Sequence, residues 1–377
     1  MRIVQITPFF APHTGGVESH VRTIAREFAR EGHDLTVVTA RYDRALPAEE
    51  TFEGYRIVRT PTLGVLLNTP IDPGTTRVLR GLEADVFHLH YPPPLTSYFA
   101  TRGLVGRKTP VVLTYHCDLD LPGATGRLVS GAYQRFFLPP TLRRVNAVVV
   151  HTRSYGITSG SLRGRELTVI PSVVDLARFR PGLETGALRS TLRLEGKRVV
   201  VFTGRLVPHK GVNVLLESLT ELPSDVVLLV IGAGPRLSSL RGLARRLDVE
   251  DRVRFCSEVS DEDLPHYLAL ADLFAFPSQN RLEGFGLAVA EAMAVGLPVV
   301  VADMPGVREV IEPGVEGLLA EPLIAGDVAA KVRTILDDPA LAHRMGTAGR
   351  RRAEERYGAP TVVGQLLTAY AALRAAG

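Results

Sequence analysis

A chain of 377 residues is longer than one hydrophobic core usually serves, which predicts two domains. Hydrophobic residues make up 45% and charged residues 22% of it, which excludes an intrinsically disordered chain, and no apolar run approaches the ~20 residues of a membrane-spanning helix. The net charge of +4 allows an anionic partner, but the arginines are scattered and not interleaved with aromatic residues, so we expect no nucleic-acid binding.

Two features indicate where the protein works. Cys117 and Cys256 are the only cysteines, too few for a disulfide framework, which is typical of a reducing cytoplasm. The start, MRIVQITPFF, is too short an apolar run for a signal peptide. We therefore expect a cytoplasmic protein, either free or at a membrane surface.

Short apolar runs alternate with longer amphipathic segments along the chain. In the first half, strands are predicted at residues 2–7, 34–39, 85–90, 110–116 and 146–152, with a helix at 17–32. In the second half, strands are predicted at 197–204, 226–232, 252–257, 273–278 and 298–303, with helices at 211–222, 235–249, 262–271 and 286–296. This alternation is typical of βαβ units around a parallel sheet, and it predicts two doubly wound α/β domains. Ligands of such sheets bind at the carboxyl ends of the strands.

Two glycines, Gly15 and Gly16, stand between the first strand and the first helix. Glycine lets the backbone come close to an anion, and a helix N-terminus presents N–H groups and a positive dipole end. A tight strand-to-helix turn explains the same residues, so both interpretations stay open.

The next strand-end motif, FTGRLVPHKG, carries Arg205 and Lys210. An arginine fork and a compact lysine charge on one loop suit a diphosphate. A solvated surface arginine is the alternative. Lys210 is one of only four lysines and precedes a glycine, which favours the ligand interpretation.

The motif LVIGAGPRL places Gly232 and Gly234 after another strand. It lacks the third glycine of a dinucleotide-binding fingerprint, and no acidic residue follows a second strand at the expected place. We interpret it either as a tight turn or as a loop that borders a nucleotide.

Glu283 and Glu291 lie around a Gly-Phe-Gly turn in an apolar stretch, with a helix predicted to begin near Phe285. Buried carboxylates need partners. Glu283 could cap the helix and Glu291 could be a satisfied buried residue. Alternatively, the N–H groups of Gly284, Phe285 and Gly286 beside a carboxylate would bind the hydroxyls of a sugar.

Three histidines stand at strand ends in the first half. His88 and His90 share one strand face, and His116 ends the next strand. No third ligand at metal spacing accompanies the first two, so we predict no metal site.

Together these motifs resemble the retaining nucleotide-sugar glycosyltransferases of the GT-B type (glycosyltransferase family 4, group 1). The matching stretches are GGVE at 15–18, EGHDLTVVT at 31–39, GRLVPHKG at 204–211, IGAGP at 231–235 and EGFGLAVAEAMAVGLPVV at 283–300. The resemblance implies two Rossmann-like domains that face each other across a cleft. Residues 1–178 would bind the acceptor and residues 179–357 the donor, with a last helix at 358–377 returning to the first domain.

The resemblance also implies roles for the motif residues. Arg205 and Lys210 would hold the donor diphosphate, with Gly15, Gly16 and Gly204 close to it and the Gly232–Gly234 loop bordering the nucleotide. Glu283, with the backbone of Gly284, Phe285, Gly286 and Leu287, would bind the donor sugar, and Glu291 would bind the ribose. His116 would contact the sugar near the reacting carbon. His116, Arg205, Lys210 and Glu283 are therefore the predicted catalytic residues.

The implied reaction transfers a hexose or N-acetylhexosamine from a UDP- or GDP-sugar to a hydroxyl acceptor, with retention of configuration and no metal or other cofactor. The acceptor would be a small molecule, a lipid-linked sugar or a glycan. A nucleotide-sugar epimerase and a non-catalytic accessory protein are the alternatives, and an NAD-dependent oxidoreductase fits worst.

Three segments complicate these expectations. Many relatives carry Pro-Asn-Gly-Val-Asp where this chain has PSVVD at 171–175, and the loop PSQNRLEGFG at 277–286 is longer than the commonest pattern. Residues 126–145 mix arginine with Phe136 and Phe137, which allows peripheral membrane contact, although core packing is the favoured interpretation.

Overall fold

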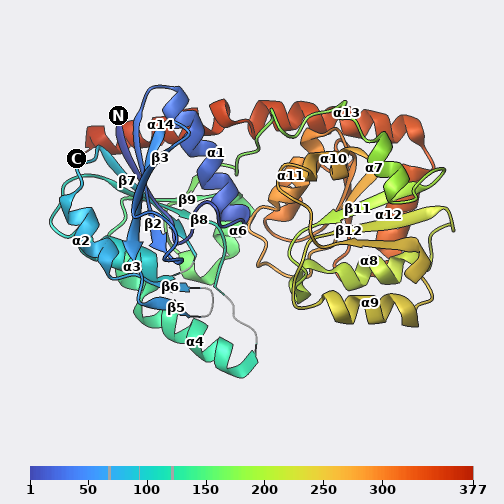
Figure 1. The fold of residues 1–377 in the computed structure, drawn as a ribbon, viewed down its shortest axis with the longest axis horizontal. Helices are drawn as coiled ribbons and strands as arrows, with labels where there is room; N and C mark the ends of the chain where they lie inside the picture. Colours follow the sequence, from blue (N-terminus) through green and yellow to red (C-terminus); the bar gives the residue numbers. More distant parts are fainter. Residues whose placement is uncertain (67–68, 93, 120–122, 377) are drawn as a thin grey trace. The chain divides into compact units, whose positions relative to one another are not determined.

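A computed structural model describes residues 1–376 except 67–68, 93 and 120–122 (Figure 1). The chain forms two compact units, Met1–Val173 with Ala359–Gly377, and Val174–Gly358. Each unit is built on a largely parallel sheet with helices on both faces. The predicted α/β fold class, with two doubly wound domains, is confirmed.

The sheet of the first unit contains β1 (Arg2–Ile6), β2 (Asp34–Arg41), β3 (Glu49–Phe52), β4 (Tyr55–Pro61), β7 (Val86–Tyr91), β8 (Val111–Tyr115), β9 (Ala147–Val150) and β10 (Thr168–Val169). Their order is β10-β9-β8-β7-β1-β2-β4-β3, and neighbours run parallel except β3 and β4. A separate antiparallel hairpin joins β5 (Gly64–Leu66) to β6 (Thr69–Ile71). Because β1 pairs with both β2 and β7, the strand order reverses there, where doubly wound folds bind ligands.

The helices of this unit are α1 (Gly16–Arg30), α2 (Gly74–Gly81), α3 (Pro94–Gly103), α4 (Gly123–Phe136), α5 (Leu138–Leu142), α6 (Arg153–Thr158), the 3-10 helix η1 (Gly160–Leu162) and α14 (Ala359–Ala376). Helix α1 buries Val21, Ile24 and Phe28 on one face, the spacing of an amphipathic helix. It packs against α14 on one face of the sheet, while α2 and α3 cover the other face (Figure 1).

Alternation along the central strands divides the core of the first unit into two layers. Ile3 and Val37 pack toward α1 and α14. Val4 and Leu89 pack toward α2 and α3. Successive strand residues point to opposite faces, so a strand covered on both sides must be apolar throughout.

The second unit contains β11 (Arg198–Thr203), β12 (Val226–Ile231), β13 (Val253–Cys256), β14 (Leu273–Phe276), β15 (Val299–Ala302) and β16 (Gly317–Ala320). The order β13-β12-β11-β14-β15-β16 is that of a Rossmann fold, and all of these pairs are parallel. The strand β12 is buried at every position, which explains its uninterrupted apolar sequence VVLLVI.

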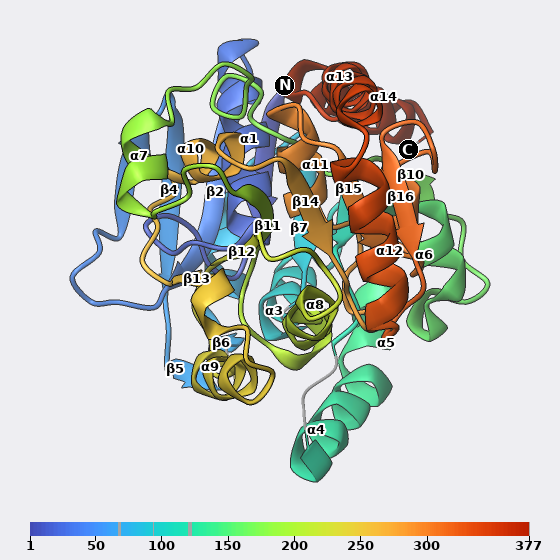
Figure 2. The same ribbon diagram turned by 90° about the vertical axis from the view of Figure 1, so that its right-hand side faces the viewer.

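Its helices are α7 (Gly186–Thr191), α8 (Val212–Leu219), α9 (Leu237–Arg246), α10 (Leu264–Ala269), α11 (Leu287–Ala294), α12 (Ala325–Leu336) and α13 (Pro339–Arg356), with 3-10 helices η2 (Pro208–Lys210), η3 (Glu250–Arg252) and η4 (Val307–Val310). Helices α8 and α12 lie side by side on one face of the sheet (Figure 2). Helices α11 and α13 pack together on the other face.

The boundary between the units lies after Val173, five residues before the predicted position. Val174 forms a β-bridge with Gly358, and its N–H donates to the carbonyl oxygen of Tyr357 at 2.8 Å. These bonds tie the segment after Val173 to the second unit. The last helix, α14, lies in the first unit, where Tyr370 stacks on Phe28.

Candidate active site

The loop after β11 holds the two predicted cations. The Lys210 ammonium forms an ion pair with Glu283 and lies 4.8 Å from the centroid of the Phe276 ring. Both charged side chains are only 16% exposed, so water screens the pair weakly. Gly204 borders this pair, because a Cβ there would lie 3.8 Å from Cε of Lys210. Arg205 is exposed.

The pairing follows from strand order. Lys210 follows β11 and Glu283 follows β14, and these two strands are neighbours in the sheet. Their carboxyl ends therefore meet at one edge, although the residues are 73 positions apart in sequence. The structure thus brings together the residue predicted to hold phosphate and the residue predicted to bind sugar.

Gly232 and Gly234 lie directly against the same loop. A Cβ at Gly232 would be 2.2 Å from the carbonyl oxygen of Gly204, and one at Gly234 would be 2.5 Å from that of Leu206. Both φ angles are positive, at 128° and 159°. Packing of the two loops by itself requires glycine here, which supports the tight-turn interpretation of IGAGP. It also holds these residues at the border of the Lys210 loop.

Helix α11 begins at Leu287, one or two residues later than predicted. Its N-cap is Gly286, with φ 84°. Glycine has no side chain that could accept a hydrogen bond from the N–H groups of the first helical turn. Glu283 does not cap the helix, so that alternative is wrong; its carboxylate bonds to Lys210 instead. Phe285 is buried.

Glu291 lies within α11 and is partly buried. Loss of hydration raises its pKa to about 8, although Arg178 and Lys210 lower it, while Asp261 raises it further. The carboxyl group is therefore mostly protonated in the free protein at pH 7. In this state it can donate a hydrogen bond as well as accept one.

In the first unit, Gly15 is the N-cap of α1 with extended backbone, and Gly16 is the first helical residue. A Cβ at Gly15 would lie 2.4 Å from Oε2 of Glu18, whose other carboxylate oxygen is 3.0 Å from Nδ1 of His13. A Cβ at Gly16 would meet no atom within 4 Å. The nearest atom at Gly15 is the end of a flexible side chain that can move aside, so packing within the chain requires glycine at neither position.

Gly16→Ala tests whether a phosphate approaches the N-terminus of α1, and the added Cβ causes no steric strain within the protein. If a phosphate approaches this helix end closely, the added methyl group should raise the KM for the donor about 10-fold, a cost of about 1.4 kcal/mol. The melting temperature should stay the same or rise slightly, because alanine favours helix more than glycine. Steady-state kinetics and thermal unfolding measure the two effects.

The matched control for this substitution is Gly186→Ala, at the first residue of α7, where a Cβ also meets nothing within 4 Å. That variant should behave like the wild type in both measurements. An unchanged KM in Gly16→Ala would argue for a simple turn at Gly15–Gly16.

His116 follows β8 and is held through both ring nitrogens. Its Nε2 is 3.1 Å from Nδ1 of His90, and its Nδ1 is 2.9 Å from Nε2 of His151. His88 is similarly engaged, with Nδ1 2.6 Å from the Tyr370 hydroxyl and Nε2 2.7 Å from that of Thr114. The strand-end histidines thus belong to a buried hydrogen-bonded network.

Sequence reasoning missed two histidines of this network. His20, on α1, lies with its ring centroid 5.1 Å from those of His116 and His151, and its Nδ1 is 3.0 Å from the Ser172 hydroxyl. Ser172 belongs to the divergent PSVVD segment, which gives that segment a local contact. The strand-end position of His151 could have been noticed in VVVHT, but nothing in the sequence marks His20 on its helix.

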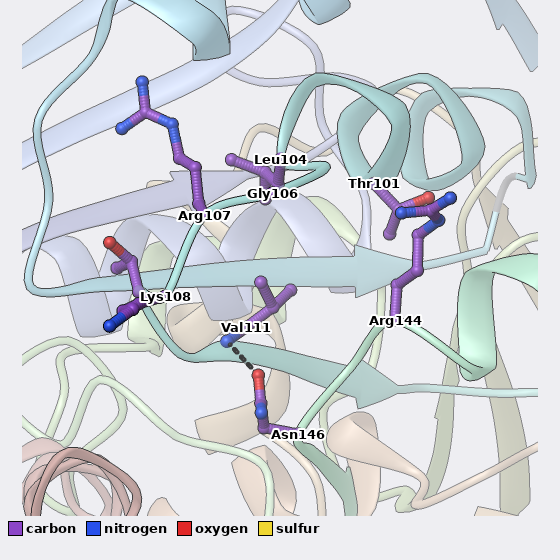
Figure 3. Close-up of a pocket in the computed structure, with 9 residues that line it drawn as sticks. Thr101, Leu104, Gly106, Arg107, Lys108, Val111, Arg144 and Asn146 are labelled. Carbon is purple, nitrogen blue, oxygen red and sulfur yellow. Dashed lines mark hydrogen bonds between the residues drawn. The ribbon is translucent and has the colours of Figure 1, made fainter. Parts of the chain in front are cut away.

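A surface pocket of about 210 Å³ lies at the amino end of β8, lined by Val111 and Asn146 among others (Figure 3). Arg107, Lys108 and Arg144 make it basic. Arg107 already donates to the carbonyl oxygens of residues 80 and 82, and none of the predicted site residues lines this pocket. It lies at the opposite strand end from His116.

Two further properties concern metals and membranes. In the described part of the chain, no three His, Cys, Asp or Glu side chains are arranged so that they could hold a metal ion. Every helix within the same residues is too short or too polar to cross a membrane.

Comparison with known proteins identifies the family. Residues 187–352 match the family model described as glycosyl transferases group 1, and residues 14–178 match that of glycosyltransferase family 4. A GDP-mannose-dependent alpha-(1-6)-phosphatidylinositol monomannoside mannosyltransferase of Mycobacterium tuberculosis is 30% identical over 93% of this chain and 92% of its own length. A phosphatidyl-myo-inositol mannosyltransferase of the same species is 30% identical over 100% of this chain and 98% of its own.

Solved structures share the fold. Sucrose-phosphate synthase from Thermosynechococcus elongatus superposes with a TM-score of 0.83 at 23% identity, and each chain is covered completely. Anabaena HepE in complex with UDP and glucose gives a TM-score of 0.81 at 21% identity, covering 99% of this chain and 100% of its own. The epimerase and accessory-protein alternatives are not favoured by these findings. The family predicted from the motifs is confirmed: this chain belongs to the group 1 glycosyltransferases of the GT-B type.

Proposed function

We propose that this glycosyltransferase moves mannose from GDP-mannose to a hydroxyl group of a phosphatidylinositol-based glycolipid, with retention of configuration and without a metal ion. The observation that carries this proposal is the similarity over almost the whole chain to relatives named as mannosyltransferases of such lipids. UDP-glucose is a second candidate donor, because a solved structure of similar fold is named as a complex with it.

The proposed chemistry is stabilisation of the leaving nucleoside diphosphate. Departure of GDP develops negative charge, and Lys210 with the exposed Arg205 would neutralise it. In the free protein Lys210 is paired with Glu283. A bound diphosphate would share that ammonium and leave the Glu283 carboxylate available for sugar hydroxyls. These two cations take the place that Mg²⁺ holds at many phosphate sites.

Glu291 suits the ribose of the same donor. Its carboxyl is mostly protonated at pH 7, because burial raises its pKa to about 8. A neutral carboxyl adds no repulsion toward the negatively charged diphosphate. It can donate to one ribose hydroxyl and accept from the other. Backbone groups of Gly286 and Leu287, at the start of α11, would contact the mannose.

The test is calorimetric binding of GDP-mannose, UDP-glucose and UDP-N-acetylglucosamine with a chelator present. Tight binding of GDP-mannose alone supports the proposed donor; preference for a UDP-sugar would overturn it. Transfer of labelled mannose to phosphatidylinositol vesicles in chelator then tests the acceptor and the metal independence. The anomeric configuration of the product, determined by NMR, tests retention.

We also propose that the first unit contacts a membrane surface through α4. Leu128 and Phe136 on this helix are 75% and 67% exposed, with Arg127 and Arg135 beside them in sequence. Ser130 and Tyr133 form its buried side. Apolar side chains next to arginines favour an anionic lipid surface.

The double variant Leu128→Ser with Phe136→Ser should lose most sedimentation with vesicles that contain phosphatidylinositol, while donor binding in solution stays unchanged. Burying two large side chains in lipid contributes about 3 kcal/mol or more, which corresponds to a loss of about 100-fold in partitioning. Ile157→Ser with Val315→Ser, at other exposed apolar positions, is the control. Equal sedimentation of both variants with the wild type would exclude α4 as the contact.

A further inference from the structure

Five buried or partly buried histidines gather at one end of the first unit's sheet, from α1 and from the ends of β7, β8 and β9: His20, His88, His90, His116 and His151. Three of them form a continuous chain. His90 Nδ1 meets His116 Nε2 at 3.1 Å, and His116 Nδ1 meets His151 Nε2 at 2.9 Å.

Each end of this chain has a partner of different chemistry. At one end His151 Nδ1 lies 3.0 Å from the carbonyl oxygen of Ile170, which can only accept. At the other end His90 Nε2 lies 2.6 Å from Oε1 of Gln5. The Gln5 amide nitrogen lies 3.4 Å from the hydroxyl of Tyr370. An amide side chain can donate or accept, depending on which way it is turned.

The number of hydrogens in the chain differs between the two orientations. The chain contains four contacts, and each needs one hydrogen. Three neutral imidazoles carry only three N–H groups. With Oε1 toward His90, both ends accept, so one ring must be a cationic imidazolium. With the amide nitrogen toward His90, Gln5 supplies the fourth hydrogen and all three rings stay neutral.

The surroundings favour the neutral chain. Burial lowers the pKa of His90, His116 and His151, the last to about 4. Among the contacts of the described residues, titratable groups that face the chain include His20 from α1, His88 from β7 and Tyr370 from α14. None of these provides a negative charge at neutral pH to balance an imidazolium.

We infer that Gln5 is a positioning residue that, together with the carbonyl of Ile170, sets the tautomer of His116. This requires the Gln5 amide to be turned over, with its oxygen and nitrogen exchanged, from the orientation in the structure, which has Oε1 toward His90. Turned in this way, its N–H donates to His90 Nε2, and the direction of donation then runs along the chain to the carbonyl of Ile170. His116 therefore carries its hydrogen on Nδ1 and accepts at Nε2. The rotated Oε1 of Gln5 accepts from the Tyr370 hydroxyl, which in turn accepts from Nδ1 of His88.

The consequence for catalysis rests on the proposed function, in which His116 contacts the donor sugar. Glycosyl transfer develops positive charge at the anomeric carbon. An imidazolium at His116 would repel that charge, whereas a neutral ring would not. Gln5 therefore serves transfer by keeping the chain uncharged.

The experiment is NMR of the full-length protein with ¹⁵N-labelled histidines at pH 7. In the wild type we expect His116 with a protonated Nδ1 and an unprotonated Nε2, and no imidazolium in the chain. Gln5→Glu places a carboxylate acceptor at His90, so the chain must take up a proton, and an imidazolium signal should appear. Gln5→Met has similar length and no hydrogen to donate, and it should keep all three rings neutral.

Kinetics on the same proteins separate this inference from the proposed function. Gln5→Glu should lower kcat about 10-fold, the effect of a repulsion of about 1.4 kcal/mol, with little change in the donor KM. An Nε2-protonated His116 or an imidazolium in the wild type would overturn the inference, as would neutral rings in Gln5→Glu. The expected NMR spectra with an unchanged kcat would uphold the tautomer and contradict the placement of His116 beside the reacting carbon.

Discussion

Lys210→Met is expected to lower kcat for sugar transfer about 100-fold or more, because a positioned charge that meets the leaving diphosphate is removed. It should also lower the free energy of unfolding by about 1–3 kcal/mol, since the poorly exposed carboxylate of Glu283 loses its partner. The methionine retains most of the apolar stem that packs near Phe276. Steady-state kinetics and urea unfolding measure the two effects separately.

A second substitution separates stability from catalysis. Lys210→Met combined with Glu283→Gln removes the unpaired charge, so it should recover much of the stability and none of the activity.

Arg205→Met should slow transfer without any stability loss, because that side chain is exposed. Arg246→Met, at an exposed position of α9, is its control. Near-normal kcat in both Lys210→Met and Arg205→Met would exclude leaving-group stabilisation by this loop.

Glu291→Gln is expected to be more stable than the wild type, and this difference in the free energy of unfolding should grow as the pH rises. The folded-state pKa of Glu291 is raised to about 8, so the protonated form stabilises the fold at low pH. That contribution is lost as the pH rises from the unfolded pKa of about 4.3 through the folded pKa. Glutamine stays neutral throughout, and its advantage should reach about 2 kcal/mol or more by pH 9.

Thermal unfolding of Glu291→Gln and the wild type between pH 5 and 9 measures this difference. Glu321→Gln, at an exposed carboxylate of the same unit, should show no such trend. At pH 7 Glu291→Gln should bind GDP almost as the wild type does, because the wild-type carboxyl is mostly neutral there, whereas Glu291→Ala should bind about 10-fold more weakly. A constant difference in melting temperature across the pH range would contradict a raised pKa.

The alternation of strands and helices could be predicted because its signals are local. The stretch VVLLVI is apolar at every position, since β12 is covered on both faces, and Val21, Ile24 and Phe28 repeat with helical spacing. Element ends were less certain. Helix α11 begins at Leu287 because Gly286 adopts a left-handed conformation, which the sequence permits but does not require.

The positions of the site residues could also be predicted, because loops after parallel strands meet at one sheet edge. Their partners could not. Lys210 and Glu283 form a pair only because β11 and β14 are neighbours in the sheet. The sequence does not show which strands are neighbours. The helix-capping interpretation of Glu283 is wrong because its carboxylate bonds to Lys210, a contact that depends on this strand order.

By itself the sequence determined the α/β class, the loops that carry Arg205, Lys210, Glu283 and Glu291, and the family. Only the tertiary structure decided how these residues pair and which groups surround His116. Its partners His90 and His151 are 26 and 35 residues away, and Gln5 is 85 residues from His90. Propensity and periodicity act over a few neighbouring residues, whereas such contacts depend on strand order and register, which arise when the whole sheet packs.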